Sequence, residues 1–557
     1  MDEPLVNLGR ARWLTLMAIS LGISMIIVDA TIVNVAIPSI VRDLGLDGSG
    51  AEWIVSVYPL VFAALLITLG RTGDIIGRKR LYIFGLVTFV GASLLAGLAP
   101  TGQLLIAARM LQGVGGAAIA PATQSILNTT FRGKDRAIAF AVYGSVIGGM
   151  AALGPLLGGW LTTNVSWHWA FLINLPVGII ALVATLRWVA ESRDEHARAG
   201  FDVPGFATLT FGLAAVVFGM IEGYSYGWLA PSKALAIGGW SWPLAGVSII
   251  PFAFALGTLS LVAFVAIELS RQRAGKFILF DFTLWANPSF RFGNLTATIV
   301  ALGEFGLLFA LPLFLQGVLG LSAFETGIVF LALAVGAFVA APIAGGFAHR
   351  FEARRVVQIG MALEALGVLS AALLLAPDMS GLTLAGPLFV YGVGVGFATA
   401  QLANVVLSEV PPERSGLASG ANSTMRQIGT AIGAALIGTV LLVGLNTGTR
   451  DRLAAVPGLP ATTAAQVAGM IEASDGQALI ALRSDPQAAA AVPAIESAFT
   501  DAARTAGLVA AGFIGLGLLF SLRLPAPAPM ERTAAEISLE VPERRRGELA
   551  REVARAD

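Results

Sequence analysis

Apolar segments of about twenty residues recur along almost the whole chain, and they constrain its fold more than any other feature. A helix of that length and composition can cross the hydrocarbon core of a bilayer. The run from Trp13 to Ala36 is too long for a signal-peptide core and is interpreted as the first span. We predict fourteen spans, at 13–36, 51–70, 81–100, 103–125, 137–161, 169–190, 204–223, 247–268, 292–316, 324–347, 356–376, 383–405, 418–444 and 505–522.

The composition agrees with lipid as the solvent of this chain. Of its 557 residues, 56% are hydrophobic and 13% are charged, with a mean hydropathy of +0.79. A soluble fold could not hide that much apolar surface, and a net charge of zero gives no general attraction to nucleic acid. The chain has no cysteine, and its three histidines show no metal-ligand spacing. No Walker-type loop is present, so we expect no metal, no cofactor and no direct use of ATP.

Lysine and arginine are distributed unevenly between the two sets of loops. The loops on one side carry eighteen of these residues, and those on the other carry two, Arg42 and Lys233. Short loops rich in Lys and Arg remain in the cytoplasm. We therefore expect a multi-pass protein of the bacterial inner (plasma) membrane, with both termini cytoplasmic.

Two pairs of loops indicate an internal repeat. Residues 70–80 and 345–355 both begin with glycine and end in a cationic cluster, and basic loops at 132–137 and 411–416 occupy matching places further on. Duplicated six-helix halves that rock about a central site are a known transporter design, although basic cytoplasmic loops can also resemble one another by chance. We predict a cytoplasmic N-terminus (1–12), an N-terminal six-helix half (13–200), two inserted helices (201–290), a C-terminal six-helix half (291–524) with an external segment (446–503), and a disordered cytoplasmic tail (525–557).

Three charged side chains are predicted to lie inside the membrane, where ionisable groups are costly and usually functional. At about 1.5 Å per residue, Asp29 and Arg109 reach similar depths and can meet. A carboxylate that is alternately hydrated and buried beside a guanidinium can gain and lose a proton. A static ion pair between two helices is the structural alternative. Glu304 is the approximate counterpart of Asp29 if the halves repeat, and it would carry a second proton, attract a cationic substrate, or remain neutral through burial.

The segment from Gly70 to Arg80 carries more charge than a turn between two spans requires. Gly77 permits the turn, and Asp74 can accept from amides at a helix N-terminus or pair with a cation such as Arg78. A second glycine-rich run suits a helix that bends and packs closely against a neighbour. It ends in Gly154, Pro155, Gly158 and Gly159.

Taken in order, these segments resemble the fourteen-helix drug:proton antiporters of the major facilitator superfamily. The charged loop is similar to the signature loop between helices 2 and 3, and residues 29–38 to the first-helix motif. Residues 109–113 are similar to the helix-4 motif, and residues 154–159 to the antiporter motif of helix 5. Residues 167–176 and 411–416 are also similar to family segments. The resemblance spans about residues 10 to 525, and Met150 stands where the family often has glycine.

The resemblance implies a major facilitator fold that works by alternating access, usually as a monomer, and is driven by the proton gradient. It implies Asp29 in proton coupling, with Arg109 as its buried partner. It also implies a conformational latch, formed here by Gly70, Asp74, Gly77, Arg78 and Lys79. The expected function is proton-coupled multidrug efflux, in which amphipathic or lipophilic compounds, cationic ones in particular, leave the cell and antibiotic resistance results.

Several alternatives stay open on the sequence alone. An exporter of an endogenous lipid or secondary metabolite would have the same fold, and so would a proton-coupled nutrient importer. A membrane enzyme would need a converging nucleophile or metal constellation, which the sequence does not show. A sensor that transports nothing would tolerate loss of Asp29 and Arg109. Candidate residues of a substrate cavity are Tyr58, Phe62, Gln112, Phe305, Phe309 and Glu364.

Overall fold

The structure is a computed structural model in which nearly all of the predicted helical region is described. It describes residues 5–46, 48–193, 202–232, 236–237, 240–243, 246–350, 352–474, 476, 478–483, 485, 488 and 490–525. The predicted tail lies outside the described residues from residue 526 onward. Some side chains within the helices, those of Phe305 and Phe309 among them, are also outside the described set.

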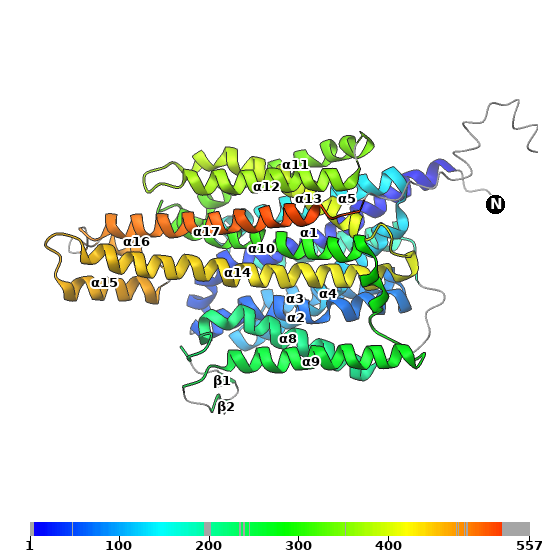
Figure 1. Ribbon diagram of the computed structural model, residues 1–557, viewed down its shortest axis with the longest axis horizontal. Helices are drawn as coiled ribbons and strands as arrows, with labels where there is room; N and C mark the ends of the chain where they lie inside the picture. Colours follow the sequence, from blue (N-terminus) through cyan, green and yellow to red (C-terminus); the bar gives the residue numbers. More distant parts are fainter. Residues whose placement is uncertain are drawn as a thin grey trace, which may run out of the picture. The chain divides into compact units, whose positions relative to one another are not determined.

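Helices account for almost all of the described secondary structure (Figure 1). The one described sheet is a hairpin of two short antiparallel strands, β1 (Ala236–Ile237) and β2 (Trp240–Ser241). Three 3-10 turns are present, η1 (Phe282–Ala286), η2 (Gly381–Leu384) and η3 (Pro412–Arg414). The α-helices are α1 (Leu5–Leu44), α2 (Gly48–Ile76), α3 (Arg78–Gly97), α4 (Gly102–Thr130), α5 (Gly133–Asn164), α6 (Trp169–Leu172), α7 (Asn174–Trp188), α8 (Val203–Tyr226), α9 (Ile249–Arg273), α10 (Pro288–Gly317), α11 (Ala323–Arg350), α12 (Ala353–Leu374), α13 (Ala385–Val406), α14 (Ser415–Ala454), α15 (Ala461–Ala473), α16 (Ala478–Leu482) and α17 (Val492–Ser521).

Twelve helices of the described part are long and apolar enough to cross a membrane. The predicted ninth and tenth spans correspond to α10, with 30 residues, and α11, with 28 residues. Neither is among the twelve, and both contain residues whose side chains are not described. The expectation of a helical fold is confirmed, whereas the count of fourteen spans and the side of the termini remain predictions.

The packing of α1–α7, here called the N-half, recurs in α10–α14 with α17, here called the C-half. In the N-half, α4 packs against α2 and α3, and α1 packs against α5 and α7. In the C-half, α13 packs against α11 and α12, and α10 packs against α14 and α17. This is the arrangement that two copies of one six-helix unit would give. The domain boundaries drawn from the sequence nevertheless remain a prediction.

The inserted helices α8 and α9 form a pair beside the bundle (Figure 1). Helix α8 contacts α2 of the N-half and α14 of the C-half, so the pair lies across the seam between them. The segment that follows α9 returns to the C-half, where Asp281 forms an ion pair with Arg414. Arg414 Nη1 lies 2.5 Å from Asp281 Oδ2. The inserted pair is thereby fixed to both halves.

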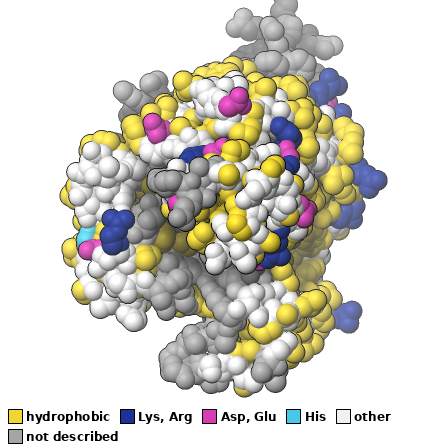
Figure 2. Space-filling model, turned by 90° about the vertical axis from the view of Figure 1, so that its left-hand side faces the viewer, with side chains coloured by type: hydrophobic (Ala, Val, Ile, Leu, Met, Phe, Trp, Pro, Cys, Tyr) yellow, Lys and Arg dark blue, Asp and Glu magenta, His cyan; other side chains and the backbone are white. Residues whose placement is uncertain are grey.

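The segment predicted as external packs against the C-half. Helices α14 and α17 continue into it, and α15 and α16 lie at the left-hand end of Figure 1, the end where β1 and β2 also lie. Ile471 and Leu479 are buried in the core of the C-half. Arg483 donates to Glu496 at 2.6 Å and also to the carbonyl oxygen of Val318. Figure 2 looks onto this end and shows charged side chains scattered among hydrophobic and uncharged ones.

Glycines allow the helices of each half to approach closely, as small residues do in membranes. A Cβ built on Gly429 of α14 would lie 2.1 Å from the carbonyl oxygen of Thr298 on α10. The hydroxyl of Thr298 donates to the carbonyl of Met425 at 3.1 Å across the same contact. This contact leaves no room for a side chain at position 429.

We expect Gly429→Ala to destabilise the protein, because a methyl group at that position forces α10 and α14 apart at a cost of about 1–3 kcal/mol. The measurement is the thermal unfolding midpoint of the purified protein in detergent. Gly512→Ala is the matched control, because a Cβ there meets nothing within 4 Å and alanine favours the helix by about 1 kcal/mol. Equal midpoints for the two variants would contradict the close contact.

Candidate functional site

Asp29 and Arg109 meet in the interior of the N-half, as the depth argument predicts. Arg109 Nη1 of α4 lies 2.5 Å from Asp29 Oδ2 of α1. Asp29 has no exposed surface and Arg109 is 1% exposed. A charge pair buried this deeply must satisfy its remaining hydrogen-bonding groups within the protein.

Polar side chains from three helices complete this charge network. Gln112 of α4 accepts from Arg109 at 2.8 Å and donates to Asp29 Oδ1 at 2.9 Å. Asn174 of α7 donates to the same Asp29 oxygen at 2.9 Å. Both amides also donate to the hydroxyl of Ser93 on α3, at 2.8 and 3.2 Å. The carboxylate therefore accepts from a guanidinium and two amides.

The guanidinium of Arg109 also makes a hydrogen bond to the backbone and a cation–π contact. Its Nε donates to the carbonyl of Ile54 at 3.2 Å, and its Cζ lies 4.5 Å from the ring centroid of Tyr58. Cation–π contacts of this kind add to the attraction of a desolvated cation. Asp29 supplies the negative charge that balances Arg109 in this network.

The glycine-rich face of α5 packs against α1 next to Asp29. A Cβ on Gly154 would lie 1.7 Å from the hydroxyl of Thr31, and one on Gly158 would lie 2.9 Å from the carbonyl of Ile32. Pro155 lies inside α5, where it removes a helical hydrogen bond. Gly159 is buried. The segment predicted as the antiporter motif therefore borders the charge network.

Asp74 at the end of α2 joins the two halves. Its Oδ1 accepts from Arg78 Nη2 at 2.8 Å and from the amide of Gly416 at 2.8 Å. Its Oδ2 accepts from the amide of Leu417 at 2.8 Å. Gly416 and Leu417 are the second and third residues of α14, so Asp74 occupies the anion-binding end of a C-half helix. Both partners considered for Asp74 from the sequence, helix amides and Arg78, are present.

The other residues of the predicted latch are shaped by glycine and by Glu191. Gly77 has φ 112°, and a Cβ there would lie 2.6 Å from the carboxylate of Glu191. Glu191 accepts from the backbone amides of Lys79 and Arg80 at 3.0 and 3.3 Å, which caps the start of α3. A Cβ on Gly70 would lie 2.4 Å from the carbonyl of Gly416. Only glycine permits this turn and this close approach of α2 to α14.

Further hydrogen bonds close the seam around the latch. Asn128 of α4 donates to the hydroxyl of Ser415 at 2.5 Å. Arg136 of α5 donates to the carbonyl of Asn404 at 3.1 Å, and Gln401 of α13 donates to the carbonyl of Ala137 at 3.0 Å. The N-half and the C-half are thus joined by side chains at the end of the bundle that carries the latch.

Glu304 has a partner that the sequence did not lead us to name. Arg426 Nη2 of α14 lies 3.4 Å from Glu304 Oε2 of α10, and Thr399 of α13 donates to Glu304 Oε1 at 3.3 Å. Glu364 of α12 is fully buried, and among the described residues its carboxyl oxygens have no hydrogen-bond partner. The C-half therefore has a charge cluster of its own, and its geometry differs from that of the N-half.

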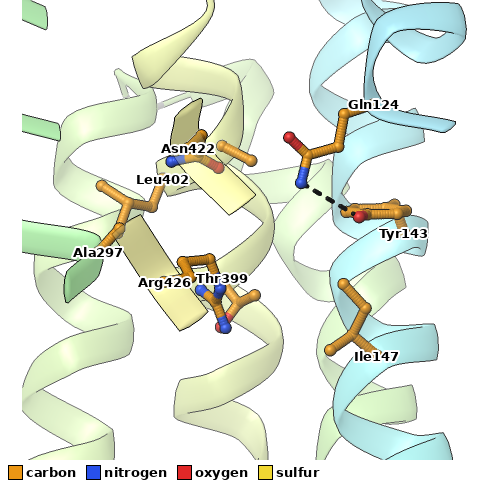
Figure 3. A pocket seen from close by; sticks show the side chains of 9 residues that line it. Gln124, Tyr143, Ile147, Ala297, Thr399, Leu402, Asn422 and Arg426 are labelled. Atoms are coloured by element: carbon orange, nitrogen blue, oxygen red, sulfur yellow. Dashed lines mark hydrogen bonds between the residues drawn. The ribbon is translucent and has the colours of Figure 1, made fainter. Parts of the chain in front are cut away.

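A pocket lies between the halves, next to Arg426 (Figure 3). Gln124, Tyr143 and Ile147 of the N-half face Asn422, Arg426 and Thr399 of the C-half across it. The cavity volume is about 10 Å³, which is room for about one water-sized group. Its remaining lining residues are Ala297, Leu402 and Ala403.

The predicted cavity residues are distributed over several places. Tyr58 lies against Arg109 and stacks on Phe62 with ring centroids 5.9 Å apart, and neither lines the pocket. Gln112 belongs to the charge network, and Glu364 is not among the residues that line the described pocket. The side chains of Phe305 and Phe309 lie outside the described residues. Four lining residues were not predicted from the sequence, namely Gln124, Tyr143, Asn422 and Arg426. An arginine within an apolar span was a signal that could have indicated Arg426.

Known proteins resemble this chain along most of its length. The sequence profile of the Major Facilitator Superfamily matches residues 19–434. A multidrug transporter protein of Bacillus subtilis is 29% identical, over 95% of this chain and 96% of its own. A probable actinorhodin transporter of Streptomyces coelicolor is 34% identical, over 77% of this chain and 72% of its own. A puromycin resistance protein of Streptomyces alboniger is 33% identical, over 77% and 82%.

A solved structure shows the same fold at low sequence identity. The crystal structure of the human organic anion transporter MFSD10 superposes with a TM-score of 0.57 at 13% identity, covering 93% of this chain and all of that one. The family profile, the curated relatives and this superposition agree with the helix packing described above. The chain therefore belongs to the Major Facilitator Superfamily and is a multi-pass membrane transporter.

Proposed function

We propose that the protein exports small amphipathic compounds in exchange for protons by alternating access, in the inner membrane of a bacterium. The observation that carries this proposal is the sealed contact of Asp29 with Arg109, Gln112 and Asn174. A carboxylate that is buried among donors inside a membrane protein and has no catalytic partner is suited to binding a proton. No cofactor or metal is needed, and one chain contains both halves of the proposed mechanism.

Proton binding would act on helix packing through α1. Protonation of Asp29 removes the charge that balances Arg109 and changes one acceptor oxygen into a donor. The amides of Gln112 and Asn174 would then lose part of their interaction with α1. Because Gly154 and Gly158 leave no space between α1 and α5, a small movement of α1 would be transmitted to α5 and to the seam with α11.

The latch would decide which end of the bundle is closed. Asp74 accepts from two amides of α14 and from Arg78. The two amide contacts break when α2 separates from α14, whereas the pair with Arg78 stays within the N-half. Hydrogen bonds to a charged group contribute about 1.5–3 kcal/mol each, so the latch favours the state in which this end is closed. We propose Gly70, Asp74, Gly77, Arg78 and Lys79 as this latch and Asp29, Arg109 and Glu304 as the residues concerned with protons.

The names of the relatives favour drugs or antibiotics as the transported compounds and export as the direction of transport. One is named for multidrug transport, and two are named for single compounds, actinorhodin and puromycin. A transporter dedicated to one metabolite is therefore the second candidate function. The two candidates differ in the number of compounds that trigger proton movement, and a panel of unrelated compounds distinguishes them.

We expect Asp29→Asn to abolish substrate-driven proton movement, because asparagine cannot exchange a proton. The measurement is proton flux in liposomes under an imposed pH gradient, with a panel of lipophilic cations, dyes and neutral drugs. Asp43→Asn is the matched control on the same helix, because the new amide oxygen can still accept from Trp167 Nε1, which lies 2.8 Å from the present carboxylate. Undiminished proton movement in Asp29→Asn would refute the coupling role.

We expect Asp74→Asn to open the latch end of the bundle, because a neutral amide holds helix amides and Arg78 less strongly than a carboxylate does. A loss of about 1.4 kcal/mol would shift the ratio of closed to open molecules tenfold. The chain has no cysteine, so spin labels can be placed at the exposed residues Arg132 and Glu409 and their separation measured by pulsed electron resonance. Asp135→Asn removes an exposed ion pair with Arg12 and serves as the control. Identical distance distributions for Asp74→Asn and the control would argue against the latch.

A further inference from the structure

Arg426 is the only charged side chain among the residues that line the described pocket. Its side chain is 19% exposed, whereas that of its partner Glu304 is 5% exposed, so a ligand in the pocket meets the guanidinium first. A guanidinium has five N–H donors, and the described contact with Glu304 uses one nitrogen at 3.4 Å. Because Arg426 lines the pocket, donors that Glu304 does not use are available to an acceptor oxygen there.

Asn422 lies one turn before Arg426 on the same helix, α14, and presents a buried acceptor without a partner among the described residues. Asn294 Nδ2 donates to the carbonyl of Phe290 at 2.8 Å, so Asn294 offers its oxygen to Asn422 Nδ2 at 3.0 Å. These two bonds fix the orientation of the Asn422 amide and leave its Oδ1 buried without a partner among the described residues. A buried acceptor without a partner is destabilising, and a donor on a ligand would offset that cost.

The N-half wall of the pocket also presents a buried polar atom without a partner among the described residues. Gln124 Nε2 donates to the hydroxyl of Tyr143 at 3.3 Å, and Gln124 Oε1 has no partner among the described residues (Figure 3). If the amide were reversed, its nitrogen would be left without a partner instead, so one polar atom of Gln124 stays free in either orientation. Gln124 is 5% exposed and Asn422 is 1% exposed, so bulk water does not satisfy them.

We propose that the pocket binds the oxygen-bearing end of the transported compound, with a carbonyl or other acceptor oxygen on Arg426 and a hydroxyl donor on Asn422 and Gln124. This inference rests on the proposed export function and names its substrate class. The pocket is suited to uncharged or acidic compounds that carry a carbonyl and a hydroxyl, such as hydroxylated lactones. It is not suited to an isolated cationic group, because the first charge that such a group meets is positive.

The sign of this preference depends on the pair of Arg426 with Glu304. Without the guanidinium, Glu304 would become the charge next to the pocket and would attract cations. Glu364 does not alter this argument, because it is fully buried and does not line the pocket. Removal of Arg426 should therefore reverse the preference of the pocket rather than only weaken it.

The test measures equilibrium binding to the purified full-length protein in lipid nanodiscs. The probes are 7-hydroxycoumarin, at a pH where its hydroxyl is not ionised, 7-methoxycoumarin and tetraphenylphosphonium. We expect the unchanged protein to bind the hydroxy compound at least tenfold more tightly than the other two. A site built to bind a hydroxyl rejects the analogue that lacks the donor. Comparable affinities for the two coumarins, no binding of either, or tighter binding of the phosphonium would overturn the proposal.

Variants separate the roles of the two walls. Arg426→Gln should lower hydroxycoumarin affinity at least tenfold and raise tetraphenylphosphonium affinity, and a second change, Glu304→Gln, should remove that gain. Gln124→Met keeps the size of the side chain and should reduce the distinction between hydroxy and methoxy probes. Asp135→Asn, which changes an exposed residue outside the pocket, is the control and should change none of these ratios. Unaltered hydroxycoumarin binding in Arg426→Gln would refute the role of the guanidinium.

Failure of this substrate-class proposal can be distinguished from failure of the proposed proton-coupled export. Binding in nanodiscs needs no proton gradient, so the preference for oxygen-bearing probes can hold even if Asp29→Asn leaves proton flux unchanged. That pattern would refute proton coupling alone. Normal proton coupling with a preference for the phosphonium probe would refute the substrate class alone. Size-exclusion profiles that match the unchanged protein establish that each variant is folded.

Discussion

Burial of the Asp29–Arg109 pair is the constraint on which the organisation of the N-half depends. A charge in the interior of a membrane protein is tolerated only when it is paired and its lone pairs are satisfied. Here the donors come from α4 and α7, and Ser93 of α3 receives the amide protons that remain. One carboxylate thus ties together four of the helices. Under the proposed mechanism the same arrangement would make the half sensitive to a proton, because each of these donors is directed at a negative charge.

Helix α14 links the latch to the pocket. Its first turn supplies the amides that bind Asp74, and Asn422 and Arg426 follow on the same helix. The distance from Ser415 to Arg426 along the helix is about 16 Å at 1.5 Å per residue. Arg414, at the same end, also holds the segment that follows the inserted helices, through Asp281. A rigid element with a latch contact at one end and a ligand contact further along is a physical route by which binding and closure can influence each other.

The sequence was sufficient to predict features that depend on short-range rules. It was insufficient to predict which distant segments contact each other. Hydropathy and helix rise placed Asp29 opposite Arg109, because both depend only on position within a span. The charge of the helix 2–3 loop indicated that Asp74 needs donors, but nothing local shows that they belong to Gly416 and Leu417 of the other half. Arg426 was not predicted as a site residue, because the mean hydropathy of the span from 418 to 444 stays high despite one arginine. The number of spans stays open because α10 and α11 include side chains that the structure does not describe.

The charge clusters of the two halves are not copies of each other, and the difference suggests a division of roles. In the N-half the cation comes from α4 and its side chain is 2% exposed. In the C-half it comes from α14, the counterpart of α5 rather than of α4, and its side chain is 19% exposed. A sealed pair can exchange a proton only when the helices around it move, whereas an open pair can meet a ligand directly. If both halves derive from one unit, the relocation of the arginine is what gives the C-half a contact for ligands, while the N-half keeps its charge away from them.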